Sequence, residues 1–338
     1  MLNKKNMNIF NGQSILVTGG TGSFGNELVK TILNSSKPKK LVIFSRDEQK
    51  QYVMSQQYSP DKFSCLRYFI GDVRDSARLN RAFSNIDIVV HAAAMKHVTA
   101  SEYNPTECIA TNIVGAQNII DAAIFNQVSK VIALSTDKAA NPVNLYGASK
   151  LCADKLFIAA NNLAGKPNTS FSIVRYGNVL GSRGSVIPHF EKLLLEGKKD
   201  LPLTDKNMTR FFIRLSEGVN FVISSLQNMN GGEIFVPKIK SIKIIDLISA
   251  MAGKDNYYIT GIRPGEKLHE IMIPKEEARL CVDMKDYYVI KPALKWWNSK
   301  LLEDKLKKGK SVPENFEYES SKASLLMSKI EIDSILGK

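Results

Sequence analysis

Cysteine and histidine are scarce in this 338-residue chain, which holds four of each. No two cysteines stand in a C-x-x-C spacing, and His91, His97 and His269 lack the spacing of metal ligands. The sequence therefore predicts neither a metal site nor a disulfide framework. We expect a protein of a reducing, cytoplasmic compartment.

Long hydrophobic runs are also missing. No apolar run approaches the ~18 residues that a membrane-spanning helix needs. The apolar residues near the N-terminus are interrupted by Asn11, Gly12 and Gln13, which is typical of neither a signal peptide nor a membrane span. The sequence thus predicts a soluble chain with no membrane partner.

Acidic residues are fewer than basic ones, 33 against 46, and the formal net charge is +13. The lysines are scattered, with their densest clusters at residues 37–40 and 305–310, and no aromatic residues are interleaved with them. This pattern argues against a nucleic-acid partner. A positive surplus favours small molecules that carry phosphates.

The first half of the chain alternates short apolar runs with longer amphipathic ones. Buried parallel strands are short and rich in Val and Ile, and we predict strands at 14–18, 41–44, 66–70, 86–92, 130–135 and 171–176. Helical patterns lie between them, most clearly at 22–33, 106–126 and 145–164. The alternation predicts an α/β fold of the Rossmann type, a doubly wound parallel sheet.

The second half is less regular and predicts a smaller lobe. Helices are expected at 186–196, 216–229 and 244–251, and a strand at 233–236. We predict a cofactor-binding domain over residues 1–180, to which elements within about 205–240 return. A substrate-binding lobe is expected over 181–300 and a peripheral extension over 301–338.

A glycine-rich loop joins the first predicted strand to the first helix in "ILVTGGTGSFGNEL". Gly20, Gly22 and Gly25 fit G-x-G-x-x-G, while Gly19, Gly22 and Gly25 fit the wider G-x-x-G-x-x-G. Glycines permit the tight turn and let the backbone approach a pyrophosphate at the helix N-terminus. Because a strand precedes the motif and a helix follows it, the sequence predicts a dinucleotide site.

The end of the second strand bears on the choice of dinucleotide. An NAD site usually places Asp or Glu there, whereas this chain has Ser45 and Arg46. A hydroxyl and a guanidinium suit a 2′-phosphate, so NADP is favoured, although Asp47 one residue later leaves NAD open. Asp72 and Val73 follow the third strand and are expected to flank the adenine. Ala92 to Ala94, after the fourth strand, leave room for the cofactor backbone.

The stretch "STDKAANPVNLYGASK" carries the chemistry. Tyr146 and Lys150 are four residues apart on a predicted helix and share a face. A lysine charge lowers the pKa of a phenol from about 10, which makes Tyr146 a candidate base toward an alcohol. Thr136 is placed to hydrogen-bond the same oxygen. Asp137 and Lys138 are not needed to remove the alcohol proton. Their presence therefore indicates a second chemical step.

Longer runs identify the family that the chain resembles. They are "TGGTGSFG", "FIGDVRD", "HAAAMKHV", "EYNP", "STDKAANPVNLYGASKL", "RYGNVLGSRGSV", "MTRFF", "GGEIFVPKI" and "GIRPGEKLHEIMIP". Together they resemble the inverting UDP-N-acetylglucosamine 4,6-dehydratases, which belong to the extended short-chain dehydrogenase/reductase superfamily and begin pseudaminic acid biosynthesis. The match covers about Gln13 to Asp286, and "FEYESSKAS" matches more weakly. Thr99 and His189 depart from the family pattern at loop and helix positions.

The resemblance implies a lyase that regenerates its cofactor. Tyr146 takes the proton of the sugar 4-hydroxyl, Lys138 removes the C5 proton, and Asp137 protonates the 6-hydroxyl that leaves as water. C5 is then reprotonated on the opposite face. In water an ion pair of lysine and aspartate is favoured over the neutral pair by about 6.5 pKa units. Burial disfavours each charge by up to about 3–5 units, so a dry site brings the neutral pair within reach.

The resemblance also implies the ligand contacts. The UDP-N-acetylglucosamine contacts are Lys96, Ser135, Thr136, Asn178, Val186, Thr204, Arg210, Arg263 and Glu266. The NADP contacts are Gly19, Thr21, Gly22, Ser23, Phe24, Gly25, Ser45, Arg46, Asp47, Lys50, Asp72, Val73, Ala92, Tyr146, Lys150, Val179, Leu180, Gly181, Ser182 and Arg183. Family members pair through helices, so a homo-oligomer, a dimer or a hexamer, is expected.

Three alternatives stay open at this point. A nucleotide-sugar 4-epimerase needs Tyr146, Lys150 and Thr136 but has no use for Asp137 and Lys138. A catalytically idle NADP-binding regulator is expected to have lost part of this set. A 4,6-dehydratase that feeds another deoxy-amino-sugar pathway would carry the same residues.

Overall fold

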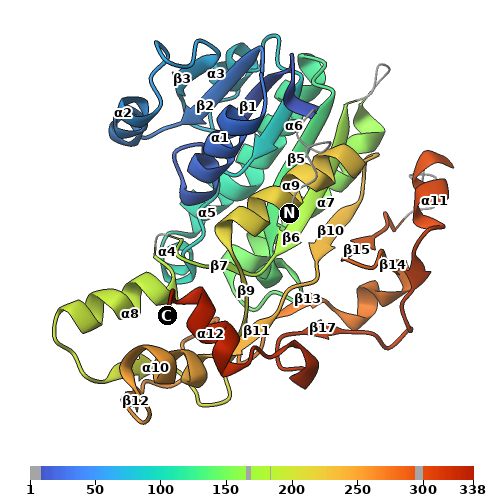
Figure 1. Cartoon of the computed structure of the whole chain (residues 1–338). Coiled ribbons are helices and arrows are strands. Elements are labelled where there is room, and N and C mark those ends of the chain that lie inside the picture. The colour runs from blue at the N-terminus through green and yellow to red at the C-terminus, as the bar shows by residue number, and fades with distance from the viewer. Residues whose placement is uncertain (1–8, 165–168, 183, 294–299) are drawn as a thin grey trace.

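A computed structural model describes residues 9–164, 169–182, 184–293 and 300–338. Its centre is a ten-stranded sheet in the order β16-β14-β15-β10-β6-β5-β4-β1-β2-β3 (Figure 1). Seven strands from β3 to β10 run parallel, and β15, β14 and β16 continue the sheet antiparallel. The order 3-2-1-4-5-6 is that of a dinucleotide-binding fold, so the predicted doubly wound sheet is confirmed.

The six strands predicted in the first half all form, with ends shifted by at most two residues. β1, β2 and β4 are short apolar runs whose residues are almost all buried, as expected for strands covered on both faces. The strands of the sheet are β1 (Ser14–Thr18), β2 (Lys40–Ser45), β3 (Leu66–Ile70), β4 (Ile88–His91), β5 (Lys130–Thr136), β6 (Ser170–Tyr176), β10 (Ile234–Pro237), β14 (Cys281–Asp283), β15 (Tyr287–Ile290) and β16 (Lys310–Ser311).

Helices cover both faces of the sheet and create two cores. Leu28 and Ile32 of α1 and Val222 of α9 pack on one face, whereas Leu79 of α3 and Phe157 of α7 belong to the core on the other. These helical elements are α1 (Ser23–Ser35), α2 (Glu48–Gln57), α3 (Ser76–Ala82), α4 (Val98–Tyr103), α5 (Pro105–Ile109), η2 (Ala110–Val114), α6 (Gly115–Phe125), η3 (Asp137–Ala139), α7 (Leu145–Leu163) and α9 (Leu215–Asn228).

The predicted helix at 106–126 forms, but it is not α-helical throughout. Its middle, η2, is a π-helical segment between α5 and α6. The wider turn buries Asn112, whose amide donates to the Met95 carbonyl (3.0 Å) and whose oxygen accepts from the Met95 amide (2.8 Å). This stretch, Pro105–Phe125, is also the single described helix long and apolar enough to cross a membrane, and half of it is buried within the fold.

The smaller lobe has a third core. Phe190 of α8, Leu203 of β8 and Leu247 of α10 are buried together there, and Figure 1 shows α8, α10 and α12 gathered beyond one end of the sheet. The remaining elements are β7 (Asn178–Val179), α8 (Val186–Leu195), β8 (Leu201–Leu203), β9 (Thr209–Ile213), β11 (Ser241–Lys243), α10 (Ile244–Ala252), β12 (Tyr257–Ile259), β13 (Ile271–Ile273), η4 (Lys275–Leu280), α11 (Lys300–Leu306), β17 (Tyr318–Glu319), η6 (Ala323–Leu325) and α12 (Lys329–Ile335).

The C-terminal segment differs from the expected peripheral extension. β16 pairs with β14 at the edge of the main sheet, and β17 pairs with β13. Tyr318, Ser320 and Ile332 are buried. The described part of the segment is therefore packed into both lobes. β10 returns to the main sheet as expected, whereas the return of β14, β15 and β16 was not predicted. The exact domain boundaries stay a prediction.

Candidate active site

A large cavity of about 1620 Å³ lies at the carboxyl ends of the parallel strands. Residues after β1, β2, β4 and β5 form one side, and the smaller lobe forms the other. Ligands of doubly wound sheets bind at this edge. Pockets for one small ligand usually measure about 300–1,000 Å³, so this cavity has room for two ligands side by side.

The glycine loop forms a cradle that a side chain would fill. A Cβ at Gly19 would lie 2.9 Å from the Ala92 carbonyl carbon, and one at Gly25 would lie 2.4 Å from the Gly20 oxygen. Gly19 also has a positive φ of 64°. Gly22 is the N-cap of α1, and no side chain caps this helix end. The residues present therefore fit a pyrophosphate at the helix N-terminus.

The turn after β2 presents an open guanidinium. Arg46 is 61% exposed and lies 3.8 Å from Asp72, which is held more closely by Arg74 at 2.7 Å. Arg74 lowers the pKa of Asp72 against the opposing effect of burial. Asp47 is committed elsewhere, because it caps α2 through the Lys50 amide. Arg46 is thus the cation that this turn offers to a ligand.

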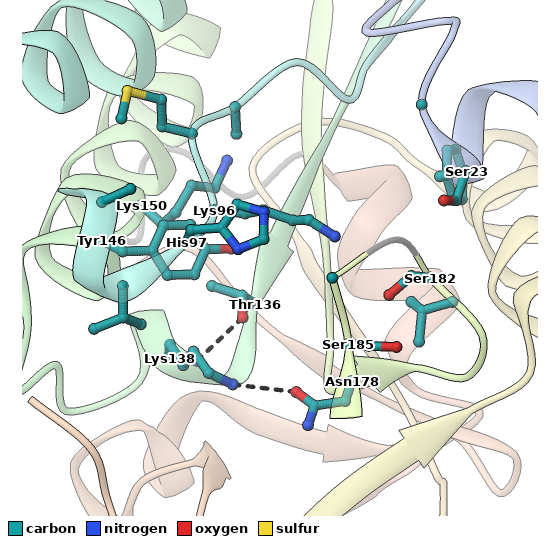
Figure 2. Close-up of a pocket in the computed structure, with 18 of the residues that line it drawn as sticks. Ser23, Lys96, His97, Thr136, Lys138, Tyr146, Lys150, Asn178, Ser182 and Ser185 are labelled. Carbon is teal, nitrogen blue, oxygen red and sulfur yellow. Dashed lines mark hydrogen bonds between the residues drawn. The ribbon is translucent and has the colours of Figure 1, made fainter. Parts of the chain in front are cut away.

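Tyr146 and Lys150 lie on the first turns of α7, which begins at the Asn144 cap. Both are buried, and Figure 2 shows them near Thr136, with the Lys96 side chain starting beside them and extending away. Burial raises the pKa of Tyr146 to about 12, although the charge of Lys138 and a hydrogen bond from Thr136 act in the opposite direction. The expected lowering of the phenol pKa is therefore wrong for the site in this state.

Lys138 is the polar group at the floor of the cavity. Its ammonium lies 3.1 Å from Asp137 Oδ1 and 3.2 Å from Asn178 Oδ1 (Figure 2 shows the Asn178 contact). Asp137 Oδ1 also accepts from the Thr136 hydroxyl at 3.0 Å. Burial raises the pKa of Asp137. Burial alone would lower the pKa of Lys138, but the charges of Asp137 and Glu270 outweigh it and raise it.

The smaller lobe contributes two arginines to the cavity, one buried and hydrogen-bonded and the other exposed. Arg210 is buried and already donates to the carbonyls of Thr209, Lys267 and Leu268 at 2.8–3.0 Å. Arg263 is exposed at the mouth of the cavity. A free diphosphate needs an open bidentate donor, so Arg263 suits it better than Arg210 does.

Comparison with known proteins agrees with this geometry. The polysaccharide biosynthesis protein family matches residues 15–292. The chain is 54% identical to the UDP-N-acetylglucosamine 4,6-dehydratase (inverting) of Campylobacter jejuni, over 97% of this chain and 98% of the relative. The chain belongs to this family. It is also 40% identical to a UDP-glucose 4-epimerase of Rickettsia massiliae, over 83% of this chain and 84% of that protein. The solved structure of Pen from Bacillus thuringiensis superposes with a TM-score of 0.87 at 36% identity, covering 97% and 98% of the two chains.

Most of the residues implied by the resemblance to this family line the one cavity. From the larger lobe these are Gly19, Thr21, Gly22, Ser23, Phe24, Gly25, Ser45, Arg46, Asp47, Lys50, Asp72, Val73, Ala92, Lys96, Ser135, Thr136, Lys138, Tyr146 and Lys150. From β7 onward they are Asn178, Val179, Ser182, Val186, Thr204, Arg210, Arg263 and Glu266. Residues far apart in the sequence thus meet at one dehydratase-like site, while their individual roles stay proposals.

Three of the predicted residues do not line the cavity. Asp137 is fully buried behind Lys138, because the 3₁₀ turn η3 directs its carboxylate toward Gly177. Leu180 packs against the core of the smaller lobe, and Gly181 turns the chain with a φ of 67°. Arg183 lies outside the described residues. The role of Asp137 as the acid stays a prediction.

Several cavity residues were not singled out from the sequence. Glu270 and Lys267 come from "GIRPGEKLHEIMIP", a run typical of the dehydratase family in which only Arg263 and Glu266 were named. His97 also lines the cavity and lies against Gly184. The two departures that were named from the sequence, Thr99 and His189, line the cavity too. The signal for Glu270 was an isolated acid directly before an apolar strand.

Proposed function

We propose that this protein is a C5-inverting UDP-N-acetylglucosamine 4,6-dehydratase that forms UDP-2-acetamido-2,6-dideoxy-β-L-arabino-hex-4-ulose. The observation that carries the proposal is the Asp137–Lys138 pair, set beside Tyr146 and Thr136 in one cavity and combined with 54% identity to an enzyme of that name. The pathway is proposed to be pseudaminic acid biosynthesis in the cytoplasm, by a homodimer or hexamer.

Different residues of the chain serve the two stages of the reaction: Tyr146 and Thr136 act at C4, and Lys138 acts at C5. The glycine loop and Arg46 would hold NADP, which would supply the acceptor for a hydride from C4 and the donor of that hydride to C6. Tyr146 takes the 4-hydroxyl proton, and Thr136 holds the same oxygen, because the two hydroxyls lie together at the end of β5. The resulting ketone acidifies the C5 proton. Lys138 then faces the sugar as the group that removes this proton.

Proton accounting favours Asp137 as the partner of Lys138. If the lysine proton passes to Asp137, Lys138 becomes a neutral base and Asp137 an acid, and no charge leaves the buried pair. Lys138 then takes the C5 proton, and the Asp137 proton accompanies the 6-oxygen as water departs. Elimination leaves the pair in its starting state. The proton that C5 then regains on the opposite face equals the one that Tyr146 took from the 4-hydroxyl, so the protons of the whole turnover balance. Because Asp137 lies behind Lys138, the lysine must move aside or carry that proton for it.

Replacing the lysine tests its role. We expect Lys138→Met to abolish the 4-keto-6-deoxy product and the uptake of solvent deuterium at C5. Slow C4 oxidation should persist, since Tyr146, Lys150 and Thr136 remain. The measurement is proton NMR of UDP-N-acetylglucosamine incubated with the enzyme in D₂O, with absorbance of the reduced cofactor followed in parallel.

Lys155→Met is the matched control, because Lys155 is exposed on α7 away from the cavity. It should turn over as the wild type does. Full turnover by Lys138→Met would remove Lys138 from the mechanism.

A second candidate, a UDP-sugar 4-epimerase, is favoured by the 40% identity to the Rickettsia massiliae protein of that name. The two candidates differ in their product. A plain C4 epimer without deuterium at C5 would identify the epimerase, whereas a deuterated 4-keto-6-deoxy sugar identifies the dehydratase. The buried acid–lysine pair has no task in epimerisation, which is why we place the dehydratase first.

A further inference from the structure

Glu270 is a buried carboxylate that the steps above do not use. It directly precedes β13 and is only 2% exposed. Its amide donates to Ser320 Oγ at 2.9 Å, which holds its backbone against the C-terminal segment. Its Oε1 lies 3.3 Å from the Lys138 ammonium and 3.7 Å from Arg210 Nε. Its Oε2 has no hydrogen-bond partner among the described residues.

Lys138 therefore has three oxygen acceptors around one nitrogen. They are Asp137 Oδ1 at 3.1 Å, Asn178 Oδ1 at 3.2 Å and Glu270 Oε1 at 3.3 Å. An ammonium has three N–H donors and no lone pair. Two of them hydrogen-bond to Asp137 and Asn178, and Glu270 faces the same charge as an ion pair. A neutral amine would direct its lone pair at one of these oxygens. The geometry thus selects the protonated form of Lys138 in the resting site.

Lys138 becomes a base only when one of the two carboxylates takes its proton. Asp137 is the better acceptor of the two. Each carboxylate has one buried oxygen without a partner among the described residues, Asp137 Oδ2 and Glu270 Oε2, so the neighbouring charges decide between them. A proton on Glu270 would instead lie next to the Arg210 guanidinium, which disfavours it. The proton therefore moves between Lys138 and Asp137.

The other charged and titratable groups around Lys138 do not change this assignment. Lys267 donates to the Ala140 carbonyl at 2.7 Å, and Glu266 pairs with Arg210 at 3.5 Å. The groups that face the ammonium from the surrounding elements are Asp137, Tyr146, Arg210, Lys267 and Glu270, and Glu266 lies beside them in its ion pair with Arg210. With Tyr146 neutral, the three cations and three anions of this cluster balance, and Glu270 supplies one of the two anions that contact Lys138.

We propose that Glu270 is a positioning residue that keeps the elimination proton inside the site, by holding it on Lys138 beside Asp137. The inference rests on the proposed dehydration for its meaning in catalysis. The proton passes from Lys138 Nζ to an Asp137 oxygen, Lys138 then takes the C5 proton, and the Asp137 proton leaves with the 6-oxygen as water. Without the Glu270 charge the proton is lost to solvent at lower pH, and a base remains without its acid.

The direct test is a titration of Lys138 in the full-length protein. Lysine labelled with ¹³C at Cε is introduced, and the Lys138 signal is assigned by its absence from Lys138→Met. In the wild type we expect Lys138 to stay protonated above the pKa of free lysine, about 10.4. In Glu270→Gln the pKa should fall by at least about one unit, whereas Glu270→Asp should retain most of the wild-type value, because it keeps the charge.

The pH profile of dehydration gives the second readout. The basic limb of kcat should move to lower pH by at least about one unit in Glu270→Gln, and Glu270→Asp should restore it. A lowered kcat with an unmoved limb in both variants, or an unchanged Lys138 titration, would overturn the proposal. If Glu270→Gln does not fold, loss of the wild-type Lys138 proton below the pKa of free lysine overturns it equally. Wild-type protein that makes no dehydrated product but shows the expected titrations refutes the proposed function and not this inference.

Discussion

At the scale of single side chains, burial decides which protonation states this fold holds. His91, at the end of β4, is 2% exposed and lies 2.8 Å from Thr18 Oγ1. That oxygen also accepts from the Ala92 and Ala93 amides, so its own hydrogen points to His91 Nδ1. Burial, aided by the charge of Lys150, lowers the pKa of His91 to about 3. The imidazole is therefore neutral in the folded protein.

This neutral histidine predicts a loss of stability in acid. An unfolded histidine binds a proton below about pH 6.5, while the folded one does so only near pH 3. The unfolded state then binds more protons, so stability falls as pH drops below 6.5, by about 2 kcal/mol between pH 6.5 and 4.5. Urea denaturation at both pH values measures it. His91→Asn keeps an acceptor for Thr18 without titrating, and its loss over this interval should be smaller by that amount. Equal losses in both proteins would contradict the prediction.

The residues that sequence reasoning placed correctly are those whose spacing is local. Tyr146 and Lys150 share one helix face, and Asp137 and Lys138 follow one strand, so their proximity needs no tertiary information. Glu270 could not be found in this way, because its contact with Lys138 depends on where β13 lies. The pKa of Tyr146 was misjudged since the sequence shows the neighbouring lysine but not the degree of burial.

At the scale of elements, strand and helix positions were predictable and their internal irregularities were not. The apolar runs at 14–18 and 66–70 are the observed β1 and β3. The π-helical segment η2 escaped prediction because a single wide turn leaves the hydrophobic periodicity of its flanks unchanged. The glycine loop and the β2–α2 turn, by contrast, follow from residue types alone, and both line the cavity.

The β2–α2 turn predicts the choice of cofactor. Arg46 is the open cation there, and a charge-assisted hydrogen bond to a 2′-phosphate contributes about 1.5–3 kcal/mol. Arg46→Ala should therefore weaken NADP⁺ binding by about 10- to 100-fold and leave NAD⁺ binding nearly unchanged. Isothermal titration calorimetry with both cofactors is the measurement, and Arg81→Ala, at an exposed position on α3 outside the cavity, is the control. An unchanged affinity for NADP⁺ would assign the phosphate, if one binds, to other residues.

At the scale of the whole molecule, the C-terminal segment packs against both lobes and contacts the backbone of a residue in the site, Glu270. β17 pairs with β13, and Ser320 just beyond it accepts the amide hydrogen bond of Glu270. Tyr318 is 3% exposed and packs on Phe211 of β9, with ring centroids 4.9 Å apart. Composition suggested a solvated tail here, because lysines, glutamates and serines dominate it. A few buried residues fix the position of the C-terminal segment in the fold. The average composition of the segment does not reveal them.

The Tyr318 hydroxyl should contribute measurably to global stability. It donates to the Ile239 carbonyl at 2.6 Å and accepts from the Ile239 amide at 2.7 Å. Tyr318→Phe leaves both backbone groups without this partner in a partly buried place, which costs about 1–3 kcal/mol. Chemical denaturation should show a lower midpoint with an unchanged m-value. Tyr288→Phe is the matched control, because the Tyr288 ring packs against Tyr318 while its hydroxyl has no hydrogen bond among the described residues. If the fold depends on the segment as the contacts indicate, Tyr318→Phe unfolds first and Tyr288→Phe follows the wild type. Identical midpoints for all three proteins would instead make the segment a peripheral extension, as its composition suggests.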